Sequence, residues 1–192
     1  MQLTQSSDPI RDFVIAGHGN LDKVKQVLLE HPELLNVAYR WGENDSETAI
    51  QAAAQVGNAP IAEFLLGKGA PLEICTLAML GRESEVRKEL DENPASAKAT
   101  GAHGIPLLPH AVWSGNPALV ELVYDRGATD GTNLALHNSI LKGNPQIVRW
   151  VLENAKPDIG AENYQGKTPL SVATERKNAE IVQLLSQHGA RE

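Results

Sequence analysis

Cysteine, aromatic residues and long hydrophobic runs are all scarce in this chain of 192 residues. Cys75 is the single cysteine, so no disulfide can form within the chain, and a reducing compartment is indicated. Aromatic residues make up 4% of the sequence, which leaves Leu, Val, Ile and Ala to build the core. No apolar run approaches the ~18 residues that a membrane span needs. These scarcities favour tightly packed short helices and argue against a membrane protein.

Basic residues are also in the minority, since 17 Lys and Arg stand against 24 Asp and Glu for a net charge of −7. Because phosphate-binding surfaces need clustered Lys and Arg, we expect no nucleic-acid partner. Residues 1–7 contain neither a basic start nor an apolar stretch, so we expect no signal peptide. Together with the single cysteine, this composition predicts a cytoplasmic protein.

The known catalytic motifs are missing. The sequence contains no Ser-His-Asp order, no Gly-x-Ser-x-Gly turn and no His-Glu-x-x-His helix. Segment 160–168 resembles a phosphate-binding loop, but five residues instead of four separate its glycines, and a helix start explains its Gly-Lys-Thr. We therefore expect no enzyme activity and no cofactor. One alternative stays open: His103 and His110 flank a single loop and could converge in a metal-dependent sensor or enzyme, although hydrogen bonding to the backbone is the simpler role.

A small residue followed by a polar residue, and then by a stretch rich in Ile, Leu and Val, recurs along the chain. The pairs are Gly19-Asn20, Gly57-Asn58, Gly81-Arg82, Gly115-Asn116, Gly143-Asn144 and Lys177-Asn178. Their separations are 38, 24, 34, 28 and 34 residues. This spacing scatters around a period of roughly 33, at which two short helices and a turn form one stackable unit.

The last unit shows the template most clearly. Thr168 is placed to cap a helix, and Pro169 at the first helical position needs no hydrogen-bond donor. A second helix follows Asn178, with Ile181, Val182, Leu184 and Leu185 at the spacing of a buried stripe. Gly189 then stands where a helix end favours a left-handed residue.

These features together resemble the ankyrin repeat family, whose pattern runs Gly-x-Thr-Pro-Leu-His, Ala-Ala, Gly-His, Ile-Val, Leu-Leu and Gly-Ala. The match is best over 166–190, good over 47–70 and fair over 134–152, although the Thr-Pro-Leu-His tetrapeptide is never complete and only His137 keeps its histidine. The resemblance implies an all-α solenoid in which His137 ties one connecting β-turn finger to the next. It also implies a single domain of six helix-turn-helix units, at about 8–42, 43–71, 72–101, 102–128, 129–161 and 162–192.

The connections between units alternate in length. Long connections, which we call the first, second and third fingers, occupy 32–47, 94–105 and 156–167, and short ones occupy 70–72 and 128–133. Because length variation in repeats maps to loops on one face, this alternation predicts three protruding fingers with two recesses between them. The alternative is that loop lengths simply vary.

The resemblance implies protein recognition, and several residues are candidates for it. Trp113 lies at an exposed, variable position of the ankyrin pattern on the concave face, and aromatic residues are enriched at interface hot spots. The alternative is that the aromatic rings fold onto neighbouring fingers. We expect a monomer that binds one protein partner through its concave face and fingers. The candidate binding residues are Tyr39, Trp41, Gln55, Met79, His103, Trp113, Tyr164 and Glu175.

Two positions are expected to lie in the core. Trp150 is equivalent to Phe64 and Leu122 in the second helix of its unit, so we expect its ring to be buried. Cys75 falls on a first helix with no His or Asp partner at a recognised spacing, and we expect it to be a buried small hydrophobe.

Overall fold

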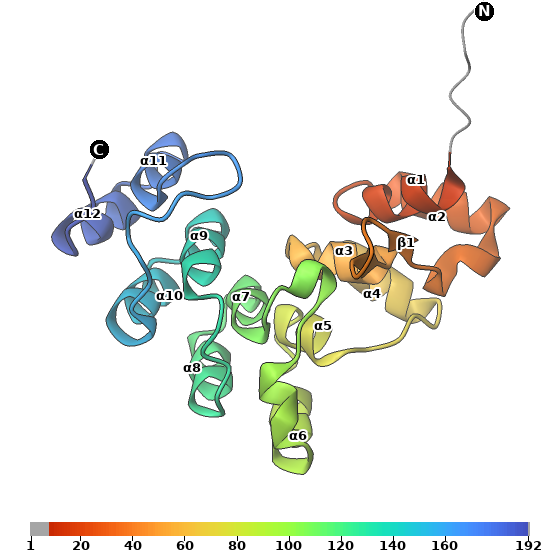
Figure 1. The fold of residues 1–192 in the computed structure, drawn as a ribbon, viewed down its shortest axis with the longest axis horizontal. Helices are drawn as coiled ribbons and strands as arrows, with labels where there is room; N and C mark the ends of the chain where they lie inside the picture. Colours follow the sequence, from red (N-terminus) through yellow and green to blue (C-terminus); the bar gives the residue numbers. More distant parts are fainter. Residues whose placement is uncertain (1–7, 192) are drawn as a thin grey trace, which may run out of the picture.

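The computed structural model describes residues 8–191, and these form a row of helix pairs that follows an arc (Figure 1). Helices α5, α7, α9 and α11 lie nearer the inside of the arc than α6, α8, α10 and α12. The pairs are α1 (Pro9–Gly17) with α2 (Leu21–Glu30), α3 (Ala49–Gln55) with α4 (Ala59–Gly67), α5 (Ile74–Met79) with α6 (Glu83–Glu92), α7 (Leu107–Ala111) with α8 (Pro117–Asp125), α9 (Thr132–Lys142) with α10 (Pro145–Trp150), and α11 (Pro169–Glu175) with α12 (Ala179–Gln187). The predicted all-α solenoid is confirmed.

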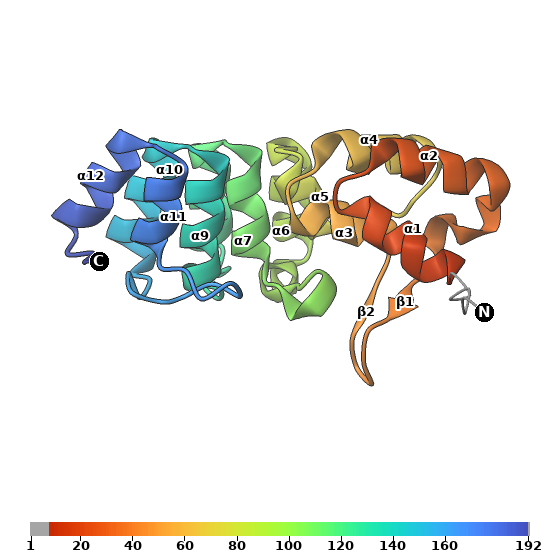
Figure 2. The same cartoon turned by 90° about the horizontal axis from the view of Figure 1, so that it is seen from above.

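Shorter elements fill the connections. The hairpin of β1 (Tyr39–Arg40) and β2 (Ser46–Glu47) is antiparallel and projects from one side of the row, as Figure 2 shows. The 3₁₀ helices are η1 (Pro32–Asn36), η2 (Pro94–Lys98), η3 (Ala102–Gly104) and η4 (Val112–Ser114), and the π-helical turn η5 (Val151–Ala155) continues α10. The second and third fingers project to the same side as the hairpin.

The recurring Gly-Asn pairs explain why the helices begin and end where they do. In all these pairs except Gly19-Asn20 the glycine adopts a positive φ that ends the first helix, as at Gly115 and Gly143, both at 74°. The asparagine then caps the second helix, because its side-chain oxygen accepts a hydrogen bond from a backbone N–H of the first turn. Lys177 takes the same left-handed conformation at φ 55° without being glycine.

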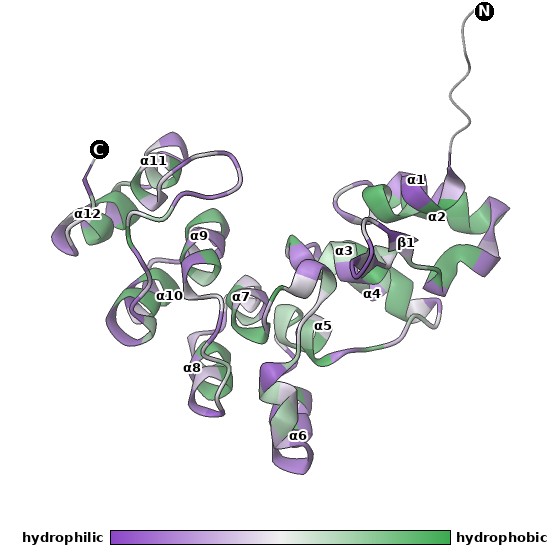
Figure 3. Cartoon of the chain, in the orientation of Figure 1, coloured by the Kyte–Doolittle hydropathy of each residue, from purple (hydrophilic) through white to green (hydrophobic). Residues whose placement is uncertain are grey.

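The last unit follows its template. Thr168 caps α11 through Ser171 N, and Pro169 is the first helical residue. Ile181, Leu184 and Leu185 are buried along α12, whereas Val182 of the predicted stripe is only partly buried. Figure 3 shows the same pattern along the row, with the hydrophobic side of each helix turned towards its neighbours and the hydrophilic side turned outward on α6 and α8.

The core consists of two clusters that meet inside α5. One joins Phe13 on α1 to Ala70 and includes Met79, and the other runs from Ile74 to Leu185. Met79 is equivalent to Trp113 in the repeat, which predicts an exposed position on the concave face, but its side chain is only 2% exposed and that prediction is wrong. The reason is the position of Met79 at the end of the short helix α5, where its side chain reaches back to the first cluster.

The position shared by Phe64, Leu122 and Trp150 is less deeply buried than the sequence predicts. Leu122 is buried, but Phe64 and Trp150 are only partly buried, so the assignment of Trp150 to the core is wrong in degree. The Trp150 ring packs edge-on against Tyr124 of the preceding outer helix, with centroids 5.2 Å apart. This position lies between neighbouring outer helices, where a large ring extends beyond the contact.

Within residues 8–191 no helix is long and apolar enough to cross a membrane. The expectation of no signal peptide concerns residues 1–7 and lies outside the described part of the chain. Cys75 is buried as expected, and burial raises the pKa of its thiol to about 12, which keeps it protonated.

Candidate functional site

The structure divides the candidate residues into two groups. Tyr39, Trp41 and His103 gather where the first two fingers meet, and we call them the finger cluster together with His18, Asp45 and Glu47. Gln55, Trp113 and Tyr164 line a hollow on the inner helices, which we call the inner groove. Met79 and Glu175 belong to neither group. Met79 is buried, and Glu175 forms an ion pair with Lys167 at 2.7 Å.

The first and second fingers contact each other directly. Nδ1 of His103 lies 2.8 Å from Oδ2 of Asp45, and the rings of His103 and Trp41 are 6.2 Å apart between centroids. Tyr39 packs edge-on against Trp41 at 4.8 Å. The predicted recess between these fingers is therefore bridged, because the short connection at 70–72 places no finger between them.

A buried carboxylate lies at the base of this contact. Glu47 is 0% exposed, and its Oε2 accepts a hydrogen bond from Nε1 of Trp41 at 2.9 Å and lies 3.5 Å from Nε2 of His103. Its Oε1 has no well-aligned hydrogen bond, and Nε2 of His18 at 3.4 Å is its nearest basic neighbour. Glu47 thus joins α1, the first finger and the second finger.

Two histidines have a pKa shifted from the ordinary value of the side chain, namely His18 in the finger cluster and His110 in the core. The contact with the Glu47 carboxylate raises the pKa of His18, against the opposing effect of burial. His110 is buried, with Nδ1 3.2 Å from the carbonyl oxygen of Ala54, and burial lowers the pKa of its ring. The folded protein therefore favours the protonated form of His18 and the neutral form of His110.

The free energy of unfolding is expected to decrease on both sides of pH 6.5 through these two groups. Because the pKa of His18 is raised above 6.5, its contribution is complete below pH 6.5 and is lost as the pH rises through the folded-state pKa. Because the pKa of His110 is lowered, its contribution is complete above pH 6.5 and is lost as the pH falls through the folded-state pKa. Each group changes the free energy by at most about 1.4 kcal/mol per pH unit.

Urea unfolding over this pH range checks the expectation. His18→Gln should flatten the alkaline side of the profile and leave the acidic side unchanged. An alkaline side equally steep in the variant would mean that His18 gains no charge stabilisation from Glu47.

The proposed convergence of His103 and His110 is not what the structure shows. His103 faces Asp45, whereas His110 is directed at the backbone of α3. Within residues 8–191 no group of three or more His, Cys, Asp or Glu side chains is arranged to hold a metal ion. His137 contacts the third finger, since its Nε2 lies 2.9 Å from the carbonyl oxygen of Ala161. Its Nδ1 has no hydrogen-bond partner within residues 8–191, so the link from one finger to the next that the resemblance implies is not formed.

The inner groove lies between the second and third fingers and has a volume of about 660 Å³. Its apolar lining comes from the end of α3, from the second finger, from η4 and from α9, and consists of Val56, Ile105, Trp113, Leu134 and Leu141. The third finger supplies Glu162, Asn163 and Tyr164, and Arg176 follows α11. The ring of Tyr164 is 93% exposed. The second of the two expected recesses is therefore a groove with an apolar floor and a polar rim.

Trp113 crosses the boundary between the two core clusters. Its Nε1 donates to the carbonyl oxygen of Gln55 at 3.0 Å, and its ring packs against the first cluster. A Cβ at Gly57 would come within 2.6 Å of the ring, so only glycine, at φ 72°, fits beneath Trp113. Trp113 is partly buried and Trp41 is 37% exposed, so both side chains reach the solvent in part.

Several groove residues are not among the candidate binding residues. Leu141 is equivalent to Trp113 in the repeat, so the repeat register places it on the concave face as well. Arg176 and Val56 follow the last residues of α11 and α3, and their place in the groove depends on how neighbouring units pack.

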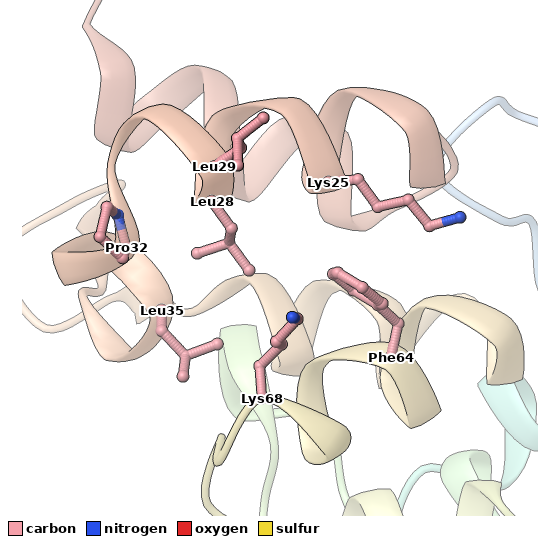
Figure 4. A pocket seen from close by; sticks show the side chains of 7 residues that line it. All are labelled: Lys25, Leu28, Leu29, Pro32, Leu35, Phe64 and Lys68. Carbon is pink, nitrogen blue, oxygen red and sulfur yellow. The ribbon is translucent and has the colours of Figure 1, made fainter.

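A second hollow, which we call the outer groove, contains none of the candidate binding residues. Helix α2 and η1 form one side of this groove and α4 forms the other, and its volume is about 400 Å³ (Figure 4). Its lining residues are Lys25, Leu28, Leu29, Pro32, Leu35, Phe64 and Lys68. Phe64 was expected in the core, and its partial exposure opens this hollow.

Comparison with protein families supports the repeat assignment. A model described as ankyrin repeats (3 copies) matches residues 108–192, and a model described as ankyrin repeat matches residues 45–77. The two matches together cover more than half of the chain.

Curated relatives share the same repeats at low identity. The chain is 28% identical over 171 residues to human B-cell lymphoma 3 protein, covering 84% of this chain and 33% of that protein. It is 29% identical over 125 residues to the ankyrin repeat protein FPV014 of fowlpox virus (strain NVSL), covering 62% and 28%. It is 29% identical over 143 residues to the BTB/POZ domain and ankyrin repeat-containing protein NPR1 of Malus hupehensis, covering 73% and 24%. The chain spans a third or less of the length of these relatives.

Proposed function

Because this chain belongs to the ankyrin repeat proteins, which typically mediate protein–protein interaction, we propose that it binds a protein partner through its inner groove and fingers and catalyses no reaction. The observation that supports this most directly is the inner groove itself. An apolar floor beside the exposed ring of Tyr164, with Asn163 and Arg176 at the rim, has the anatomy of a protein interface with a hydrophobic centre and a polar edge.

The two groups of candidates contribute differently to this proposal. The inner groove offers a concave surface that an inserted side chain or loop of a partner can fill. The finger cluster adds Tyr39 and Trp41 on a hairpin that projects from the row (Figure 2). The contact between His103 and Asp45 holds that hairpin in place, which lowers the entropy cost of ordering it when a partner binds.

Tyr164 is the residue to test first, because its ring touches the solvent almost fully and its truncation should leave the fold intact. Tyr164→Ala is expected to weaken partner binding by about 2 kcal/mol, or roughly thirtyfold, if the ring is an interface hot spot. Affinity capture with quantitative mass spectrometry identifies partners whose recovery depends on Tyr164, and calorimetric titration of the purified partner then measures the affinity.

Trp113→Ala and Trp41→Ala are expected to weaken binding by a similar amount but also to lower stability, since each indole donates a structural hydrogen bond. Their affinities must therefore be measured well below the melting temperature. Glu121→Ala, on the exposed side of α8, is the matched control and should change neither quantity. Unchanged affinity in the Tyr164 and Trp113 variants would exclude the inner groove as the binding surface.

A further inference from the structure

The outer groove combines an apolar floor with two unpaired positive charges. Nζ of Lys25 lies 5.8 Å and Nζ of Lys68 lies 5.6 Å from the centroid of the Phe64 ring, within the range of cation–π attraction. Figure 4 shows the two lysines reaching the ring from α2 and from the end of α4. Within residues 8–191 neither ammonium group has a carboxylate oxygen within 4.0 Å, and no acidic residue lines the groove.

Within residues 8–191 no other segment covers the apolar side chains of the outer groove. Leu28 and Leu35 are partly buried and face the hollow, and Leu29 beside them is 86% exposed. The outer face of a terminal repeat is generally polar, because it has no neighbour to cover it. An exposed leucine next to an apolar hollow on the first helix pair is therefore a surface that another molecule can cover.

We propose that the outer groove binds an acidic amphipathic segment of a partner protein, with apolar side chains against Leu28, Leu35 and Phe64 and carboxylates paired with Lys25 and Lys68. Because both ammonium groups lie beside one ring, a segment that covers the ring can reach both. A volume of about 400 Å³ suits a few side chains of a short segment, as when an amphipathic helix lies in a groove.

Charge complementarity selects this class of partner over a neutral or basic one. A basic segment would meet two uncompensated lysines, and a purely apolar one would leave them unpaired. The net charge of −7 opposes an acidic partner at long range, but at physiological ionic strength interactions are screened beyond about 8 Å. A docked segment is therefore affected mainly by the charges closest to it, and Lys25 and Lys68 are the charged residues that line the groove.

Peptide probes test this surface directly. The first probe, the glutamate peptide, is a helical peptide of about 14 residues with leucines at i and i+4 flanked by glutamates. The second probe, the lysine peptide, has the same sequence with lysines in place of the glutamates. The glutamate peptide should shift the NMR methyl signals of Leu28, Leu29 and Leu35. The double variant Lys25→Glu/Lys68→Glu should weaken that binding about tenfold and strengthen binding of the lysine peptide. Leu29→Ser should weaken binding of the glutamate peptide without changing the melting temperature.

The control is Lys88→Glu/Lys98→Glu, which changes the net charge equally at exposed lysines on α6 and η2 and should leave the affinity unchanged. Equal affinity of both peptides for the wild-type protein, or equal effects of the two double variants, would overturn the proposal. Self-association of the free protein that Leu29→Ser abolishes would also overturn it and assign the groove to a second copy. The proposal is independent of the inner groove, since Tyr164→Ala should not alter peptide binding.

Discussion

Deletion of residues 166–192 is expected to produce a protein that aggregates or melts at a much lower temperature. These residues contain α11 and α12, and Leu170, Val172, Ile181 and Leu185 belong to the larger core cluster. Their removal would expose the side chains on α9 and α10 that now have no solvent contact. In a solenoid each unit buries its apolar face only against its neighbours, so no other part of the chain can cover the new surface.

The expected magnitude follows from the residues that lose cover. Ile147, Val148 and Val151 are 0% exposed, and full burial of such a side chain contributes about 1.5–3 kcal/mol. Partial exposure of three of them would remove several kcal/mol, a large share of the about 5–15 kcal/mol by which a domain is usually stable.

Circular dichroism melting and sedimentation velocity check this expectation. The matched control is removal of Arg191 and Glu192 alone, which follow α12 in the sequence, and it should leave the melting curve unchanged. A deletion variant lacking 166–192 that remained monomeric with the melting curve of the full chain would show that the last helix pair is not part of a continuous stack.

The features that are local in sequence could be predicted from it. The Gly-Asn pairs encode a helix end and a helix start within two residues, so the boundaries at Gly115 and Gly143 follow from backbone conformation and capping alone. Thr168 with Pro169 and the buried stripe of α12 are equally local. The contact of His137 with a finger could be predicted because the family resemblance implies it.

The features that depend on contacts across units could not be predicted. His103 and Asp45 are 58 residues apart, and they meet because a short connection separates two long fingers. The connection lengths were visible in the sequence, but the direction of each finger depends on side chains in other units. The same holds for Trp113, whose indole reaches the backbone of Gln55, 58 residues away. The position of a residue within its repeat does not determine which residues of a neighbouring unit its side chain contacts.

The burial of Phe64 and Trp150 illustrates a further limit. Periodicity places both on the side of an outer helix that faces a neighbour, but the spacing between outer helices decides how much of a large ring is covered. Leu122 at the same position is buried. The difference in burial among the three residues therefore depends on side-chain size and on the spacing between outer helices, and the hydrophobic pattern does not reveal it.

The double variant His18→Gln/His103→Asn is expected to destabilise the protein by about 3–5 kcal/mol. Glu47 is fully buried, and these two rings are its basic neighbours, at 3.4 and 3.5 Å. Without them its carboxylate retains only the hydrogen bond from Trp41, and an uncompensated buried charge is costly. Asparagine is chosen at position 103 because the backbone there has φ 55°, which asparagine adopts more readily than most residues.

The decisive variant adds Glu47→Gln to that pair. If the loss comes from an unpaired buried charge, the neutral amide should restore most of the stability, because it needs hydrogen bonds but no counter-charge. Glu47→Gln alone should instead destabilise the protein, since it removes the charge that both histidines face. Urea unfolding of the single, double and triple variants gives the coupling energy. His31→Gln is the control, because its ion pair with Glu33 is exposed and should contribute within about 0.5 kcal/mol. If the triple variant were less stable than the double, Glu47 would act through shape and hydrogen bonding, and charge pairing would not be what joins α1 to the two fingers.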